Sequence, residues 1–150
     1  MRTLTRVLLA LLAASAAWMG AWALLAPRSF FTGFPGLGWR WVAVDGPFNE
    51  HLVRDVGGLS LGLAVMNAVA AWRPARMMVA TAAAAGMCFY LPHFAYHAGH
   101  LDMLSSSQQI AQTIALSGPV ISAFVLLVAA WRMPSVGGVD RGADEDTDER

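Results

Sequence analysis

The side chains best suited to chemistry fall into two short stretches of the sequence. They are Glu50, His51, Arg54 and Asp55 in the first stretch, and His93, His97, His100 and Asp102 in the second. Residues three or four apart share one face of a helix, so each acid of the first stretch can pair with the basic side chain four residues away. The three histidines of the second stretch would form one stripe in the same way. The spacing therefore predicts two polar stripes on two helices.

A transition-metal site is one use of these stripes. Two histidines four residues apart on a helix can chelate a single ion, and His93 and His97 have this spacing. A third ligand from Glu50, His51 or Asp55 would leave one coordination position open. No general-base glutamate lies between the two histidines, and we identify no catalytic motif. The candidate metal ligands are His51, His93 and His97, and no reaction is assigned to them.

Two redox cofactors suit the same residues. Haem is ligated axially by one histidine from each of two facing helices, here His51 with His93 or His97. A quinone headgroup could instead hydrogen-bond to a His–Asp pair beside Phe89 and Tyr90, which would relay its protons. No motif favours either cofactor, and aromatic rings near helix ends also form the interfacial belt of membrane proteins.

A structural role accounts for the polar residues equally well. Arg54 in a partly dehydrated place needs an anion, which Asp55, Glu50 or Asp102 can supply. Polar side chains between membrane helices hold those helices together, each contributing roughly 1 kcal/mol or less. We therefore expect a protein of undetermined activity whose polar cluster mainly organises a helix bundle and has the chemistry to bind a ligand. A metal-binding protein and a haem- or quinone-associated subunit of a redox complex are the alternatives.

Composition places the chain among integral membrane proteins. Of its 150 residues, 57% are hydrophobic and 13% are charged, which is more apolar than a typical soluble domain. All ten basic residues are arginines, which excludes a Schiff-base lysine, and they are too scattered for nucleic-acid binding. The single Cys88 excludes an intrachain disulfide. The lipid bilayer is the expected partner, alone or with a homo-oligomer or a larger membrane complex.

Four apolar runs predict an all-α bundle of four transmembrane helices in one domain, residues 1–132. Each run can cross the roughly 30 Å hydrocarbon core of a bilayer. The expected helices are residues 7–26, 50–72, 77–97 and 108–131, the last interrupted by Gly118-Pro119. Residues 1–16 also resemble a cleavable secretory signal. The apolar run continues to Pro27, which favours a retained helix.

The connection over residues 27–49 is expected to be an outer loop rich in aromatic residues, glycine and proline. Glycine and proline break regular structure, whereas the aromatic rings suit the membrane interface. A lid over a pocket is the functional alternative. Residues 133–150 contain six of the ten acids. They are expected to form a disordered, cytoplasmic tail.

The arginines predict the orientation of the bundle. Arg2, Arg6, Arg73, Arg76 and Arg132 fall at one end of the predicted helices, and Arg28 and Arg40 at the other. By the positive-inside rule both termini are cytoplasmic, and the polar cluster lies at the outer end. With a rise of about 1.5 Å per residue, Asp55, His93 and Gln112 reach one level. The two polar stripes are therefore expected to face each other.

Small residues predict where the first two long helices touch. Gly58 and Gly62 lie four residues apart, and on one helix face they form a small-xxx-small pattern. Such a pattern lets the backbone of a neighbouring membrane helix approach closely. We expect the helix over residues 7–26 to pack against this glycine face.

A family resemblance rests on several short strings. These are Phe34-Pro35-Gly36, Asn49 to Gly58 with its Glu-His-Leu-Val-Arg-Asp core, Pro92-His93, and His97 with His100-Leu101-Asp102. Together they resemble a family of small four-helix membrane proteins whose build is similar to the DoxX-like group. The resemblance covers residues 7 to 132 and implies a four-helix membrane fold. DoxX takes its name from an association with a quinol oxidase, so the resemblance also implies a redox role, and it carries over no catalytic residue.

Overall fold

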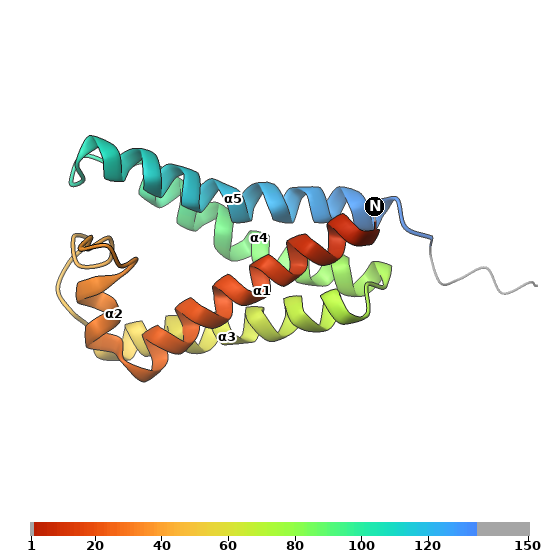
Figure 1. Ribbon diagram of the computed structural model, residues 1–150, viewed down its shortest axis with the longest axis horizontal. Helices are drawn as coiled ribbons and strands as arrows, with labels where there is room; N and C mark the ends of the chain where they lie inside the picture. Colours follow the sequence, from red (N-terminus) through yellow and green to blue (C-terminus); the bar gives the residue numbers. More distant parts are fainter. Residues whose placement is uncertain (1, 135–150) are drawn as a thin grey trace, which may run out of the picture.

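The computed structural model describes residues 2–134, and the regular structure in that range is entirely helical. Four of the helices are long and apolar enough to cross a membrane, which confirms the predicted all-helical chain with four possible spans (Figure 1). The helices are α1 (Arg2–Leu25), α2 (Pro27–Gly33), α3 (Glu50–Trp72), α4 (Arg76–Ala98) and α5 (Ser106–Trp131). Most of the predicted acidic tail, residues 135–150, lies outside the described residues.

The bounds of α3 match the predicted range, and those of α1 differ at the start. α3 begins at Glu50 because the side chain of Asn49 accepts a hydrogen bond from the backbone N–H of Leu52 at 3.1 Å. This contact satisfies one of the free donors in the first turn. α1 begins at Arg2 rather than at residue 7, so the arginines before the apolar run are part of the helix.

α5 begins at Ser106, two residues before the predicted start, and continues through Gly118 and Pro119. The predicted interruption at these residues is therefore wrong. A proline inside a helix removes one backbone hydrogen bond. In membrane proteins a helix tolerates this loss where neighbouring helices support it, and α5 packs extensively against α4.

The helices form two pairs. The most extensive contacts join α1 to α3 and α4 to α5, and smaller contacts join α3 to α4 and α1 to α5. At one end of the molecule lie the start of α1, the α3–α4 turn and the end of α5 (Figure 1). At the other end, which we call the loop end, lie α2, residues 34–49 and the α4–α5 connection. The two pairs diverge toward the loop end, and residues 34–49 fold between them.

Two glycines set the contact between α1 and α3. A Cβ atom on Gly20 would lie 2.8 Å from the carbonyl oxygen of Gly57, and one on Gly57 would lie 2.6 Å from the backbone nitrogen of Leu24. The two backbones therefore touch. The predicted contact through Gly58 and Gly62 is wrong, since nothing lies within 4 Å of a Cβ at either position. Gly57 and Gly58 point about 100° apart on the helix, so only one of them can face α1.

The connection over residues 27–49 contains α2, which the sequence analysis treated as loop. Pro27 lies in its first turn, where the missing N–H costs no helical hydrogen bond. The ring of Phe30 lies 5.8 Å from that of Trp22 and 4.8 Å from that of Phe34, and Phe34 lies 6.3 Å from Trp41 between centroids. Phe30 and Trp41 are buried. Packing of aromatic rings therefore holds this connection against α1.

Candidate functional site

The charged residues at the start of α3 form the two predicted pairs but do not meet the histidines of α4. His51 pairs with Asp55 at 3.5 Å, and their side chains are 88% and 54% exposed. Glu50 pairs with Arg54 at 2.9 Å. None of these four residues lines the cavity described below. The buried face of α3 carries Val53, Gly57, Ser60, Ala64, Asn67 and Ala70 instead. Successive helical residues turn by about 100°, so His51, Arg54 and Asp55 point away from this face, while Glu50 lies in the exposed first turn of α3.

Arg54 joins the start of α3 to the end of α1. Its guanidinium donates hydrogen bonds to the backbone carbonyl of Leu24 and to the carboxylate of Glu50. The last carbonyl groups of a helix have no partner within that helix. Arg54 therefore supplies a hydrogen-bond donor to a carbonyl group at the end of α1. The Glu50 carboxylate neutralises the charge of the Arg54 guanidinium.

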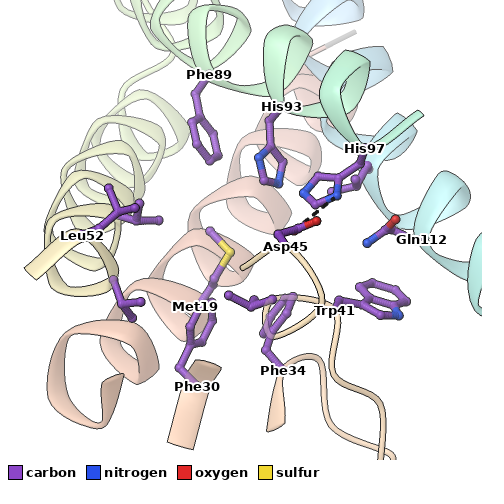
Figure 2. A pocket seen from close by; sticks show the side chains of 14 residues that line it. Met19, Phe30, Phe34, Trp41, Asp45, Leu52, Phe89, His93, His97 and Gln112 are labelled. Atoms are coloured by element: carbon purple, nitrogen blue, oxygen red, sulfur yellow. Dashed lines mark ion pairs between the residues drawn. The ribbon is translucent and has the colours of Figure 1, made fainter. Parts of the chain in front are cut away.

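His93 and His97 extend from α4 into a cavity of about 200 Å³ at the loop end (Figure 2). The two imidazole rings meet nearly edge to face, with 4.6 Å between centroids. His93 also stacks on Phe89, with 5.0 Å between centroids. The remaining apolar walls come from Met19, Phe30, Phe34, Trp41, Val42, Leu52, Val53, Val56 and Leu116. Two of the predicted site residues are thus brought together, in a mostly apolar surrounding.

The carboxylate partner of His97 is Asp45, which lies in the connection between α2 and α3. Asp45 Oδ2 lies 3.9 Å from His97 Nδ1, and the side chains are 28% and 13% exposed (Figure 2). Gly46 follows with a φ of +145°, a conformation that other residues rarely adopt. Helical spacing could not identify Asp45, because only the folding of residues 34–49 brings it to α4. The Asp-Gly-Pro string was the one local signal, since it indicates a turn.

Gln112 reaches the same cavity from α5 (Figure 2). It is 2% exposed, and within residues 2–134 its Oε1 has no hydrogen-bond partner. A buried polar atom without a partner costs about 1–3 kcal/mol. Sequence analysis placed Gln112 at this level of the bundle, and it lies there. Its amide is the most buried of the polar groups that face the cavity.

His100 and Asp102 lie outside the cavity, in the exposed connection between α4 and α5. The His100 ring stacks on Tyr96 with 4.2 Å between centroids, and its Nδ1 lies 2.7 Å from the Tyr96 carbonyl oxygen. α4 ends at Ala98, so the helical stripe predicted for the three histidines stops before His100. The tertiary structure therefore separates His100 from His93 and His97.

The predicted metal and haem ligand sets are not assembled. Across the described part of the chain, no group of three His, Cys, Asp or Glu side chains is placed to hold a metal ion. His51 is exposed on α3, while His93 and His97 face the cavity. The three candidate metal ligands therefore lie on two different surfaces. The same separation divides the haem pair, which needs His51 together with His93 or His97.

The cavity has the character of a small-molecule site. Such sites are mostly apolar and contain a few placed polar groups that orient the ligand. Here the imidazoles can each donate or accept a hydrogen bond, and the Gln112 amide can do both. A histidine beside a carboxylate can also take up and release a proton. The arrangement can bind a flat ring through its oxygen atoms and exchange protons with it.

Comparison of the chain with protein-family models, with curated proteins and with solved structures finds no match. The resemblance to DoxX-like membrane proteins therefore stays a prediction from the residues that carry it.

Proposed function

We propose that this integral membrane protein binds the headgroup of a small, lipid-soluble molecule of the quinone class in the cavity at the loop end. One observation carries the proposal. His93, His97 with its partner Asp45, and the unpartnered amide oxygen of Gln112 converge on one mostly apolar cavity, which the unpartnered Trp41 indole N–H also lines. A quinone headgroup is a flat ring whose carbonyl oxygens accept hydrogen bonds. It would stack on the aromatic walls and receive hydrogen bonds from the imidazoles, and the hydroxyl of a quinol form would donate to the Gln112 amide oxygen.

The pair of His97 and Asp45 supports proton exchange with the ligand. Quinone carbonyl groups accept hydrogen bonds and quinol hydroxyl groups donate them, so a binding site for both forms needs side chains that can do either. His97 lines the cavity, and its partner Asp45 is partly exposed at the loop end. A quinol hydroxyl that hydrogen-bonds to the His97 ring would exchange its proton with solvent through that ring and Asp45, with no change in oxidation state. Binding and proton exchange are the functions proposed for this chain.

The test measures binding of a short-chain benzoquinone to the protein in lipid nanodiscs. Binding is followed by quenching of tryptophan fluorescence and by the rise in melting temperature that a ligand of the folded state produces. We expect His93→Ala and His97→Ala each to weaken binding about tenfold, because each removes a hydrogen-bonding group from the cavity. His51→Ala and His100→Ala are matched controls outside the cavity and should stay within about twofold of wild type.

A wild-type protein with neither quenching nor a melting shift would overturn the proposal, and so would equal losses in all four histidine variants. If His97→Ala lowers the melting temperature of the free protein but leaves probe affinity unchanged, the contact with Asp45 is purely structural. Elemental analysis and an absorption spectrum of the same preparation test the metal and haem alternatives. A stoichiometric metal that is lost in His93→Ala would favour a metal site.

We also propose that the charged residues of α3 organise the bundle. The support is the contact of Arg54 with the Leu24 carbonyl, which ties α3 to the end of α1. The exposed pair of His51 and Asp55 lies one turn away on the same end of α3. Charged side chains are costly in hydrocarbon, so their place fits the polar boundary of the membrane.

The arginines support an orientation with both termini in the cytoplasm. The turn between α3 and α4, with Arg73 and Arg76, lies at the same end as the start of α1 and the end of α5 (Figure 1). By the positive-inside rule this end is cytoplasmic and the loop end is outside. In a Cys88→Ser background, Ser105→Cys is expected to react with an impermeant maleimide added outside cells, and Ala75→Cys is not. The opposite pattern would reverse the orientation.

A further inference from the structure

A second cavity of about 170 Å³ adjoins the first, away from the loop end. The two cavities share the side chains of Met19, Phe34, Trp41, Phe89, His93 and Leu116. The polar side chains found only in the second cavity, Ser15, Ser60 and Tyr90, already have partners. The serine hydroxyls donate to carbonyl groups of their own helices, Ser15 to Leu12 at 3.1 Å and Ser60 to Val56 at 2.7 Å, and the Tyr90 side chain hydrogen-bonds to Asn67. The polar groups near a ligand in the shared wall are therefore His93 and the Trp41 indole N–H, which line both cavities.

The second cavity reaches the surface between α1 and α5. Ser15 and Trp18 on α1 and Ala115 on α5 line it, and all three are exposed, Trp18 to 54%. The two helices lie close at the end opposite the loop end, where residues of both line one groove. They separate toward the loop end (Figure 1). The sides of membrane-spanning helices face lipid, so this opening faces the hydrocarbon of the bilayer.

We propose that the ligand carries an apolar tail, which lies in the second cavity and extends into the bilayer between α1 and α5. This inference rests on the proposed function and specifies its ligand as a lipid-tailed quinone that reaches the site sideways from the membrane. The shared lining of the two cavities supports it. His93 lines both, so a headgroup that His93 holds in the first cavity would have its tail next to the second. The exposed rim of Ser15, Trp18 and Ala115 supports it as well, because it gives the tail a path to lipid.

The experiment compares two probes with the same benzoquinone headgroup, one with a decyl tail and one with a methyl group. Both affinities are measured in nanodiscs and expressed per lipid, so that partition into the bilayer is removed from the comparison. Ala115→Phe places a ring in the opening between α1 and α5. It is expected to weaken binding of the tailed probe about tenfold and to leave the tailless probe within about twofold of wild type. Ile114→Phe is the matched control, since Ile114 is exposed on α5 and lines neither cavity.

A second measurement avoids any loss of folding in the variant. A tailed probe with a diazirine at the tail end is expected to label wild-type peptides that contain Trp18 or Ala115. Labelling confined to other lipid-facing residues, such as Leu59 on α3, would overturn the inference. So would an Ala115→Phe variant that binds the tailed probe as wild type does, or one that loses both probes equally while remaining folded. Failure of both probes to bind wild type would overturn the proposed function itself.

Discussion

Replacing Gly57 with alanine is expected to destabilise the protein by about 1–3 kcal/mol or more, because an added Cβ has no room between α1 and α3. That Cβ would lie 2.6 Å from the backbone nitrogen of Leu24 and 3.0 Å from the carbonyl oxygen of Gly20. Both neighbours are backbone atoms, so no side chain can rotate away. The helices would have to separate along their most extensive contact. The measurement is thermal unfolding in detergent micelles, followed by circular dichroism.

Gly58→Ala is the matched control, one residue further along the same helix. Nothing lies within 4 Å of a Cβ at Gly58. Alanine is also the better helix former, so stability should stay unchanged or rise by at most about 1 kcal/mol. Equal behaviour of the two variants would mean that α1 does not pack on the Gly57 face. If only Gly58→Ala lowered stability, α1 would pack on the face of Gly58 and Gly62, as the small-xxx-small pattern predicted.

Gln112→Leu is expected to raise the stability of the ligand-free protein by about 1 kcal/mol while weakening quinone binding at least about tenfold. The amide oxygen of Gln112 is buried and unpartnered within the described residues, so its removal relieves a cost. The same amide faces the proposed headgroup from α5. If Gln112 served only to pack the helices, its replacement would not raise stability and weaken quinone binding at the same time. The two measurements are melting temperature without ligand and the dissociation constant of the short-chain probe.

Gln109→Leu provides the contrast within the same helix. Gln109 donates a hydrogen bond from Nε2 to the carbonyl oxygen of Leu104 at 2.9 Å and does not line the cavity. Its replacement should lower stability by about 1 kcal/mol and leave the probe affinity unchanged. If Gln112→Leu lowers stability as Gln109→Leu does, the Gln112 amide has a structural partner and its assignment to the ligand fails.

The positions of residues along the helices were predictable from the sequence. Four apolar runs of sufficient length predicted four long helices, and a fixed rise per residue predicted which side chains share a level. His93 and Gln112 do meet around one cavity, whereas Asp55, predicted at the same level, does not line it. The spacing of His93 and His97 also predicted correctly that they share a helix face. The level of a side chain and the face it shares with a neighbour depend only on the length and periodicity of one helix, and these follow from the local sequence.

The rotation of each helix about its axis was not predictable. In a soluble protein, polar residues mark the outward face of a helix. In a membrane, lipid and protein interior are both apolar, so an apolar residue carries little information about the direction it faces. The sequence analysis therefore directed Asp55 and Gly58 of α3 inward, whereas Val53 and Gly57 occupy that face. Close backbone packing at Gly20 and Gly57 decided the rotation.

The sequence by itself determined an all-helical membrane chain, the level of its polar residues and the pair of His93 and His97. Only the tertiary structure decided that Asp45 is the carboxylate beside them, because the aromatic rings of residues 30–41 pack on α1 and fold the connection back to α4. It also placed beside that cavity a second one, which shares six of its side chains and is lined by exposed residues of α1 and α5. Both features depend on contacts between segments far apart in the chain, and no local spacing encodes such contacts.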